Sequence, residues 1–94
     1  MNYFVYIITN ERHTVFYTGL TNDVERRTRQ HKEKFYRGFT SKYNCTKLVY
    51  VEMLPTLNAA LARERQLKRY HRAWKINLIN SINPEWRDLY TDFF

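Results

Sequence analysis

A carboxylate lies where an apolar side chain is expected in the helix predicted at residues 57–71. Apolar residues recur there at spacings of three and four, at Leu57, Ala60, Leu61 and Leu67. Glu64 falls within this stripe, and a carboxylate that faces a core is costly unless it is paired, hydrogen-bonded or bound to a cation. Glu64 is therefore a candidate metal ligand or catalytic group. The alternatives are a structural ion pair with a neighbouring arginine and a place at the edge of the stripe.

The helix predicted from Asn22 to about Lys34 also carries polar side chains on the face expected to meet the core. Residues on that face, by their i+3 and i+4 spacing, are Val24, Arg27, His31 and Phe35. Arg27 and His31 are therefore expected to point toward the sheet, unless Arg27 snorkels to water from an amphipathic edge. For His31 alone, a hydrogen-bonded histidine at the edge of the core is the simpler interpretation. Other basic residues of this helix point elsewhere and suit phosphate contacts: Arg26, Arg29 and Lys32.

Two predicted strands before that helix each carry a tyrosine. Tyr6 lies in the strand at 3–9 and Tyr17 in the strand at 15–20. The two phenols share one sheet face if the turn has a two- or four-residue register without a bulge. Gly19 admits a close approach to the backbone, by a ligand or by the following helix. The alternative is that both tyrosines are ordinary strand aromatics.

Together these side chains would place a carboxylate, an arginine, an imidazole and two phenols over one sheet. Phosphodiester hydrolysis needs such groups. A metal ion polarises a phosphoryl oxygen or activates water, and an arginine stabilises charge that develops on the phosphate. A phenol can relay a proton if its pKa is lowered from about 10.

The elements that must position these groups follow the order ββα-βαα. A third strand is predicted at 47–53, and a last helix at 73–82 is stopped by Pro84. Residues 35–46 are expected to be irregular or a short helical turn. We therefore expect an α/β (α+β) fold, with a three-stranded antiparallel sheet flanked by helices. The chain should form one domain over 1–94, with a core at about 3–83 and a C-terminal tail at 84–94 that packs back on it.

The net charge of +7 is concentrated between residues 26 and 75, which hold all lysines and arginines except Arg12 and Arg87. Basic helices interleaved with aromatic residues favour a polyanionic partner, most simply nucleic acid. The alternative is a solvated basic face that only aids solubility. Expected phosphate-backbone contacts are Arg26, Arg29, Lys32, Lys34, Arg37, Arg63, Lys68, Arg69 and Arg72.

Cysteine count and hydropathy exclude several classes of protein. The single cysteine, Cys45, excludes an internal disulfide and a cysteine-based zinc cluster. The sequence has neither a signal-peptide segment nor a run of eighteen apolar residues. We therefore expect a cytoplasmic protein without a membrane partner.

Several motifs resemble one nuclease superfamily. "VYII" followed by "FYTGLTNDVERRTRQH" resembles the paired tyrosine motifs and following helix of the GIY-YIG nucleases, in particular their small stand-alone bacterial members. "GFTSKYN", "LVYVE", "ALARERQLK" and "NPEWRDL" extend the resemblance over nearly the whole chain. The resemblance implies a metal-dependent endonuclease that hydrolyses phosphodiester bonds of nucleic acid, most simply DNA, with one Mg²⁺ or Mn²⁺.

The resemblance also implies a role for each site residue. Tyr6 matches the first motif tyrosine, a general base or a group that positions water. Tyr17 matches the second, which orients water or the scissile phosphate. Arg27 matches the arginine that stabilises the transition state, and His31 a histidine that assists proton transfer in some members. Glu64 matches the glutamate that binds the metal ion. These groups, with Tyr6, Tyr17, Arg27 and Glu64 foremost, are expected to converge on one concave face.

The chain also departs from the motif pattern. Gly19 matches the closing glycine, but the tripeptides read "FVY" and "YTG", and Phe4 in place of a small glycine is expected to narrow the pocket. Neither Asn77 nor Asn80 aligns cleanly with a further family asparagine. Without a separate targeting domain, specific cleavage would need a protein partner or recognition of nucleic-acid structure. Two alternatives stay open: a non-catalytic or weakly catalytic nucleic-acid-binding module on the same fold, and a domain that binds an acidic protein.

Overall fold

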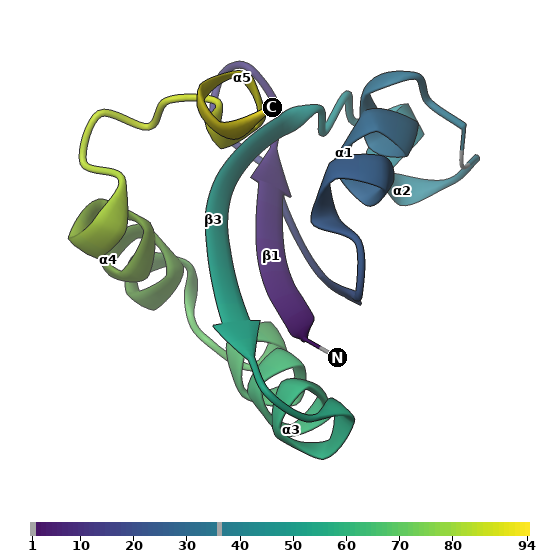
Figure 1. Cartoon of the computed structure of the whole chain (residues 1–94). Helices are drawn as coiled ribbons and strands as arrows, with labels where there is room; N and C mark the ends of the chain where they lie inside the picture. Colours follow the sequence, from purple (N-terminus) through teal and green to yellow (C-terminus); the bar gives the residue numbers. More distant parts are fainter. Residues whose placement is uncertain (1, 36) are drawn as a thin grey trace.

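The computed structural model describes residues 2–35 and 37–94. Its three strands form one antiparallel sheet in the order β2-β1-β3, so β1 is central. Figure 1 shows α3 and α4 on one side of the sheet and α1 and α2 on the other. This arrangement confirms the predicted fold class. The elements are β1 (Tyr3–Thr9), β2 (Phe16–Thr21), α1 (Val24–Lys32), α2 (Phe39–Lys42), β3 (Lys47–Leu54), α3 (Leu57–Lys68), α4 (Arg72–Ile82) and α5 (Leu89–Phe93).

Alternation along the central strand gives the sheet two buried faces. Val5 and Ile7 point to one face, where they pack with Ala60 and Leu67 of α3 and with Ile79 of α4. We call this the α3 face. The next residues along β1 point to the opposite face, which we call the α1 face; its buried cluster consists of Tyr6, Ile8, Cys45, Leu48 and Leu89. The sheet is therefore covered by helices on both sides.

Helix α1 begins at Val24, one residue later than a cap at Asn22 would place it. The side chain of Asp23, rather than that of Asn22, accepts a hydrogen bond from the Arg26 N–H. The helix ends at Lys32, and Lys34 then adopts a left-handed conformation with φ 54°. Phe35 lies outside the helix with 67% of its surface exposed, so its predicted place on the face of His31 was wrong.

The other helices agree closely with prediction. Thr56 caps α3 by accepting a hydrogen bond from the Ala59 N–H, and α3 ends at Lys68, three residues before the predicted end at 71. Helix α4 covers the segment predicted at 73–82, and residues 35–46 contain the short α2. Helix α5 was not predicted. None of the helices in the described residues is long and apolar enough to cross a membrane.

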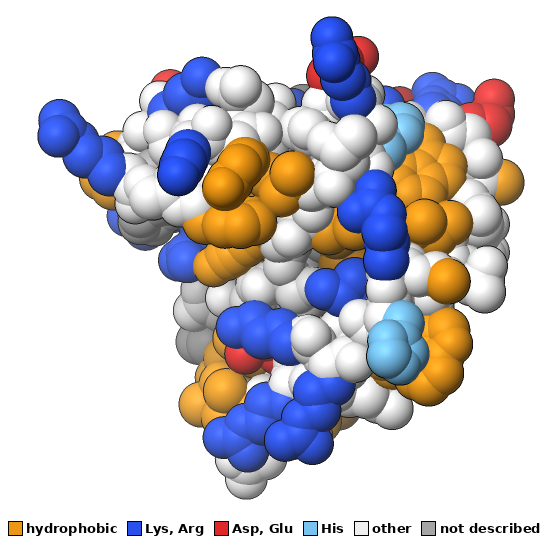
Figure 2. Space-filling model, turned by 180° about the vertical axis from the view of Figure 1, so that it is seen from behind, with side chains coloured by type: hydrophobic (Ala, Val, Ile, Leu, Met, Phe, Trp, Pro, Cys, Tyr) orange, Lys and Arg blue, Asp and Glu red, His pale blue; other side chains and the backbone are white. Residues whose placement is uncertain are grey.

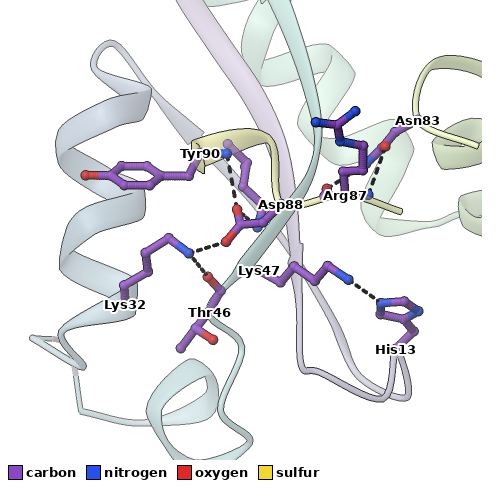
Figure 3. A network of polar contacts seen from close by, with 9 residues as sticks. His13, Lys32, Thr46, Lys47, Asn83, Arg87, Asp88 and Tyr90 are labelled. Atoms are coloured by element: carbon purple, nitrogen blue, oxygen red, sulfur yellow. Dashed lines mark hydrogen bonds and ion pairs between the residues drawn. The ribbon is translucent and has the colours of Figure 1, made fainter. Parts of the chain in front are cut away.

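The C-terminal tail is fastened by one carboxylate (Figure 3). Asp88 caps α5 by accepting a hydrogen bond from the Tyr90 N–H, and it also accepts one from the Leu48 N–H of β3. The same side chain pairs with the Lys32 ammonium of α1, which donates a second hydrogen bond to the Thr46 carbonyl. Asp88 thus joins the tail to the strand and the helix that border the α1 face.

Candidate active site

Tyr6 lies beneath the candidate site and has no exposed surface. The register of the sheet pairs it with Gly19 of β2. A Cβ atom on Gly19 would lie 2.3 Å from the Tyr6 hydroxyl and 2.4 Å from its Cζ. The group that approaches Gly19 is therefore the Tyr6 ring, not a ligand or the following helix. Only a glycine leaves room for this ring in the α1 face.

Tyr17 joins Tyr6 on the same face of the sheet. The β1–β2 connection pairs Thr9 with Phe16, which places Tyr17 opposite Ile8. The Tyr17 ring meets the Tyr6 ring edge to face, with 6.4 Å between ring centroids. From the sequence, the two tyrosines were expected to share a face only if the turn had a suitable register. The structure has such a register and brings the two rings together.

His31 links the tyrosine pair to α2. Its Nε2 lies 3.0 Å from the Tyr6 hydroxyl, and its Nδ1 lies 3.2 Å from Oγ1 of Thr40. The Tyr17 ring packs against the imidazole at a centroid distance of 5.6 Å. Only 3% of the His31 surface is exposed, and both ring nitrogens have a hydroxyl partner. Tyr6, His31 and Thr40 thus form one continuous hydrogen-bonded chain.

Burial and, to a smaller extent, the nearby positive charge of Arg27 together lower the pKa of His31 from its usual 6.5 to about 4. The imidazole is therefore neutral near pH 7. A neutral imidazole has one donor and one acceptor nitrogen, and a hydroxyl can serve either one. Both tautomers of His31 are consequently compatible with Tyr6 and Thr40.

Tyr17, Arg27 and His31 line one surface hollow of about 200 Å³. The remaining lining residues are Arg37, Phe39 and Thr40. Two arginines and no acidic side chain make this hollow suitable for an anion such as a phosphate. We call it the Arg27 pocket. Arg27 also borders a smaller neighbouring hollow of about 160 Å³, formed where β2 turns into α1.

Sequence reasoning missed part of the Arg27 pocket. Arg37 was expected only as a general phosphate-backbone contact, and Thr40 was not considered. Both come from residues 35–46, which have no periodicity from which a face could be assigned. The one available signal was the position of Thr40 within the quoted motif "GFTSKYN".

Glu64 comes from a helix that packs on the α3 face, opposite to the face of the tyrosine pair. Its neighbours in the stripe, Ala60 and Leu67, are fully buried there. The Glu64 side chain is 19% exposed and lies 3.7 Å from the Lys68 ammonium. Helix α3 packs mainly against β2 and β1. The convergence of Glu64 with Tyr6, Tyr17 and Arg27 on one concave face stays a prediction.

The carboxylate of Glu64 suits a hard cation that brings most of its own ligands. Nowhere in residues 2–35 and 37–94 do three His, Cys, Asp or Glu side chains gather into a metal cage. Mg²⁺ is usually held by one or two carboxylates, and waters and substrate phosphate oxygens complete its coordination. A single glutamate therefore fits Mg²⁺, or Mn²⁺ with its similar preference for oxygen ligands.

The expected phosphate-backbone contacts divide into internal and external cations. Three have internal partners: Lys32 pairs with the carboxylate before α5, Arg63 with a carboxylate of β3, and Arg72 donates to two carbonyls of the β1–β2 loop. We leave these three out of the nucleic-acid surface. The other six stay in that surface: Arg29 and Lys68 form only i,i+4 pairs, with Glu25 and Glu64, and Lys34 donates to the Asn44 side chain. The set is completed by Arg26, Arg37 and Arg69. Figure 2 views the molecule from behind relative to Figure 1. It shows basic side chains from the upper edge of the visible surface down to the region of α3, with few acidic side chains between them.

The two asparagines considered for the further family position have other surroundings. The Asn80 side-chain oxygen accepts a hydrogen bond of 2.6 Å from Trp86 Nε1. Asn77 lines a hollow between α3 and α4. Their described contacts do not include the tyrosine pair, so neither is added to the candidate site.

Known proteins match the chain over most of its length. Residues 2–77 match the family of the GIY-YIG catalytic domain. A UPF0213 protein from Syntrophus aciditrophicus (strain SB) is 39% identical over 83 residues, which cover 87% of this chain and 93% of that protein. A second, from Haloquadratum walsbyi, is 38% identical over 76 residues, or 81% and 84% of the two chains. The solution NMR structure of a UPF0213 protein from Bacillus halodurans superposes with a TM-score of 0.60 at 27% identity, covering 95% of this chain and 94% of that one.

Proposed function

Since the chain belongs to the GIY-YIG catalytic domain family, we propose that it is an endonuclease that hydrolyses phosphodiester bonds of nucleic acid, most simply DNA, with the help of one Mg²⁺ or Mn²⁺. The observation that carries this proposal is the Arg27 pocket. It combines two guanidinium groups, a phenol and a neutral imidazole around a hollow of about 200 Å³. These groups match the needs of phosphodiester hydrolysis.

The two arginines of the pocket bind the scissile phosphate. A guanidinium is planar and always charged, and it can donate two parallel hydrogen bonds to phosphate oxygens. Arg27 stabilises the negative charge that develops on the phosphate in the transition state, and Arg37, which also lines the hollow, supplies a second guanidinium to hold the phosphate. The partly buried position of Arg27 strengthens this effect, because solvent screens its charge less.

Hydrolysis requires a water that is held in line and a place for its proton. Tyr17 lines the pocket, so its phenol positions the attacking water. The water oxygen bonds to phosphorus, the bond from phosphorus to the leaving sugar oxygen breaks, and that oxygen gains the proton that the water loses. His31 lines the same pocket and is neutral near pH 7, so it can relay this proton along its hydrogen bonds with Tyr6 and Thr40 rather than store it.

Tyr6 acts through His31. Its full burial keeps the phenol from touching a substrate in this structure. Its hydroxyl instead fixes the imidazole from below, while Thr40 holds the other ring nitrogen. We therefore assign Tyr6 as a positioning residue, in place of the general base implied by the family resemblance.

Glu64 would hold the metal ion, which when bound supplies a Lewis acid for a phosphoryl oxygen. The Lys68 ammonium occupies the neighbourhood of this carboxylate in the free protein. An i,i+4 pair of this kind is worth only about 0.3–0.5 kcal/mol. Lys68 is 54% exposed and can move to a phosphate when Glu64 takes a cation.

A second candidate function is a nucleic-acid-binding module that does not cleave. The observation that favours it is the position of Glu64 on a helix that packs on the α3 face, while the tyrosine pair lies on the α1 face. Such a module would bind nucleic acid with steep salt dependence, because its affinity would come from phosphate contacts.

A nicking assay separates the two candidates. Branched, single-stranded and duplex DNA are incubated with Mg²⁺ or Mn²⁺ and with the parent protein, Glu64→Gln or Tyr17→Phe. We expect cleavage by the parent, loss with Glu64→Gln at every metal concentration, and strong reduction with Tyr17→Phe. Salt-sensitive binding without any cleavage by the parent would contradict the endonuclease and favour the binding module. Equal cleavage by all three proteins would show that these two residues are not catalytic.

A further inference from the structure

A large aromatic side chain stands exposed on the far side of α3 and α4 from the sheet. Trp74, in the first turn of α4, has 55% of its surface exposed. Its ring is held by two perpendicular neighbours, Tyr70 at 5.5 Å and His71 at 5.1 Å between ring centroids. An indole that is both exposed and fixed in orientation is suited to stack on a planar ligand.

Two adjoining hollows meet at this indole. One, of about 540 Å³, lies along the outer surface of α3, and the other, of about 480 Å³, continues along α4. They share Gln66, Tyr70 and Trp74, so the two form one groove with the aromatic pair at its middle. We call it the Trp74 groove. Because the two hollows are continuous, several planar groups in a row fit along the groove.

The groove is positively charged in its α3 part, whereas its α4 part is lined by uncharged side chains. Arg65 and Arg69 line the α3 part, and neither forms an ion pair with another of the described residues. Glu64 is the only acid between residues 57 and 83. It lies with Ala60 and Leu67, opposite the outer surface of α3 that faces the groove. Basic side chains also gather at the lower end of the face in Figure 2, where α3 lies in Figure 1.

We propose that the Trp74 groove binds a single-stranded segment of nucleic acid, with Trp74 stacked on a base and Arg65 and Arg69 on flanking phosphates. This inference rests on the proposed function, because it takes nucleic acid as the ligand. Aromatic side chains in a basic groove bind single strands without sequence preference, since every base has a flat face. In a duplex the bases are already stacked on one another, so the groove selects unpaired regions.

The groove lies on α3 and α4, away from the α1 face that carries the Arg27 pocket. A substrate with a single-stranded segment beside the cleaved strand could contact both. The proposal thus names a substrate class for the nuclease, in which unpaired nucleotides next to a duplex guide binding. A protein ligand is less suited, because two unpaired arginines in a groove without acids favour a polyanion over an apolar surface.

Binding is measured without divalent metal, so that cleavage plays no part. A short labelled thymidine oligonucleotide and a duplex are titrated with the parent, Trp74→Ala, Trp74→Phe and Arg69→Gln. Loss of stacking on one base should weaken single-strand binding by about fivefold to a hundredfold in Trp74→Ala. Trp74→Phe should retain most of the affinity, and Arg69→Gln should reduce the salt dependence. Phe93→Ala, which removes an exposed aromatic of α5, is the matched control and should bind as the parent does.

The same titration, followed by tryptophan emission, reports contact directly. Oligonucleotide should quench the parent and leave Trp74→Phe, whose remaining indole is Trp86, almost unchanged. Single-strand affinity of Trp74→Ala within about twofold of the parent would overturn the inference, and so would equal losses for single strand and duplex. If the parent still cleaves DNA, the proposed function survives that result. A parent that binds no nucleic acid of any form would overturn both.

Discussion

The closest contact of the candidate site yields a sharp prediction, the effect of Gly19→Ala. The new methyl carbon would lie 2.3 Å from the Tyr6 hydroxyl, 2.4 Å from Cζ and 2.8 Å from Cε1. The Tyr6 ring is fully buried and cannot move aside without disturbing its neighbours. A displaced ring would also lose its hydrogen bond to His31.

The magnitude follows from these two effects. Overpacking of a core costs about 1–3 kcal/mol, and a buried polar group left without its hydrogen bond costs about 1–3 kcal/mol. Replacing a strand glycine with alanine returns roughly 0.5–1 kcal/mol, because the unfolded chain loses freedom. We therefore expect Gly19→Ala to lower the free energy of unfolding by about 2–4 kcal/mol, a large part of the roughly 5–15 kcal/mol typical of a domain.

Urea unfolding of a double-mutant cycle measures whether Tyr6 causes this loss. Gly19→Ala is made in the parent, in Tyr6→Phe and in Tyr6→Leu. The loss should persist in Tyr6→Phe, because the ring carbon at 2.4 Å remains. It should fall to within about 1 kcal/mol of zero in Tyr6→Leu, where the ring is absent, and a coupling that large lies far outside the 0.3–0.5 kcal/mol scatter of independent sites.

Gly38→Ala is the matched control. No heavy atom lies within 4 Å of a Cβ at that position, and its φ of +125° makes alanine strained for a purely local reason. Its cost should be the same in all three backgrounds. A Gly19→Ala protein as stable as the parent, or one destabilised equally with and without the Tyr6 ring, would refute the reasoning.

Two further predictions concern charge. The pKa of His31 is about 4 in the folded protein and 6.5 in the unfolded chain. As the pH falls below 6.5, the unfolded chain therefore binds a proton at His31 before the folded protein does. The free energy of unfolding should therefore fall by about 3 kcal/mol from His31 alone as the pH drops from 6.5 to about 4, as compared by urea unfolding with His31→Gln. Asp88→Ala should cost about 2–3 kcal/mol in thermal or urea unfolding, because it removes the charged partner of Lys32 and the acceptor for two backbone N–H groups. Arg29→Ala, which breaks only an exposed pair with Glu25, should cost less than about 0.5 kcal/mol, and equal losses in the two variants would contradict the role of Asp88.

The sheet and its polar face could be predicted from sequence because they follow from local patterns. Alternation in β1 and β2 fixes which side chains share a face, and it grouped Tyr6 with Tyr17 once the turn register was known. Helical spacing likewise placed Arg27 and His31 toward the sheet. These patterns predict the face to which a side chain points but not how deeply it is buried. They therefore could not show that Tyr6 is buried while Tyr17 lines the pocket.

The rest of the site depends on tertiary structure that periodicity does not encode. The stripe of α3 predicted that Glu64 faces the sheet, but the sheet face that α3 covers is set by the path of the chain after β3. Arg37 and Thr40 reach the Arg27 pocket from a segment without a repeating pattern. The reason for Gly19 lies in a cross-strand contact with Tyr6, which a single strand does not reveal.

The central claim is that the Arg27 pocket holds the phosphate that is cleaved. Arg27 and Arg29 lie two residues apart on α1 and carry the same charge, but Arg27 lines the pocket, while Arg29 is exposed and pairs with Glu25. The most direct test compares single-turnover cleavage of DNA by the parent, Arg27→Ala and Arg29→Ala at saturating protein and Mg²⁺. The account predicts a loss of about 10²–10³-fold for Arg27→Ala, as for removal of one preorganised donor, and a rate for Arg29→Ala close to that of the parent. Equal rates for the two variants would contradict it.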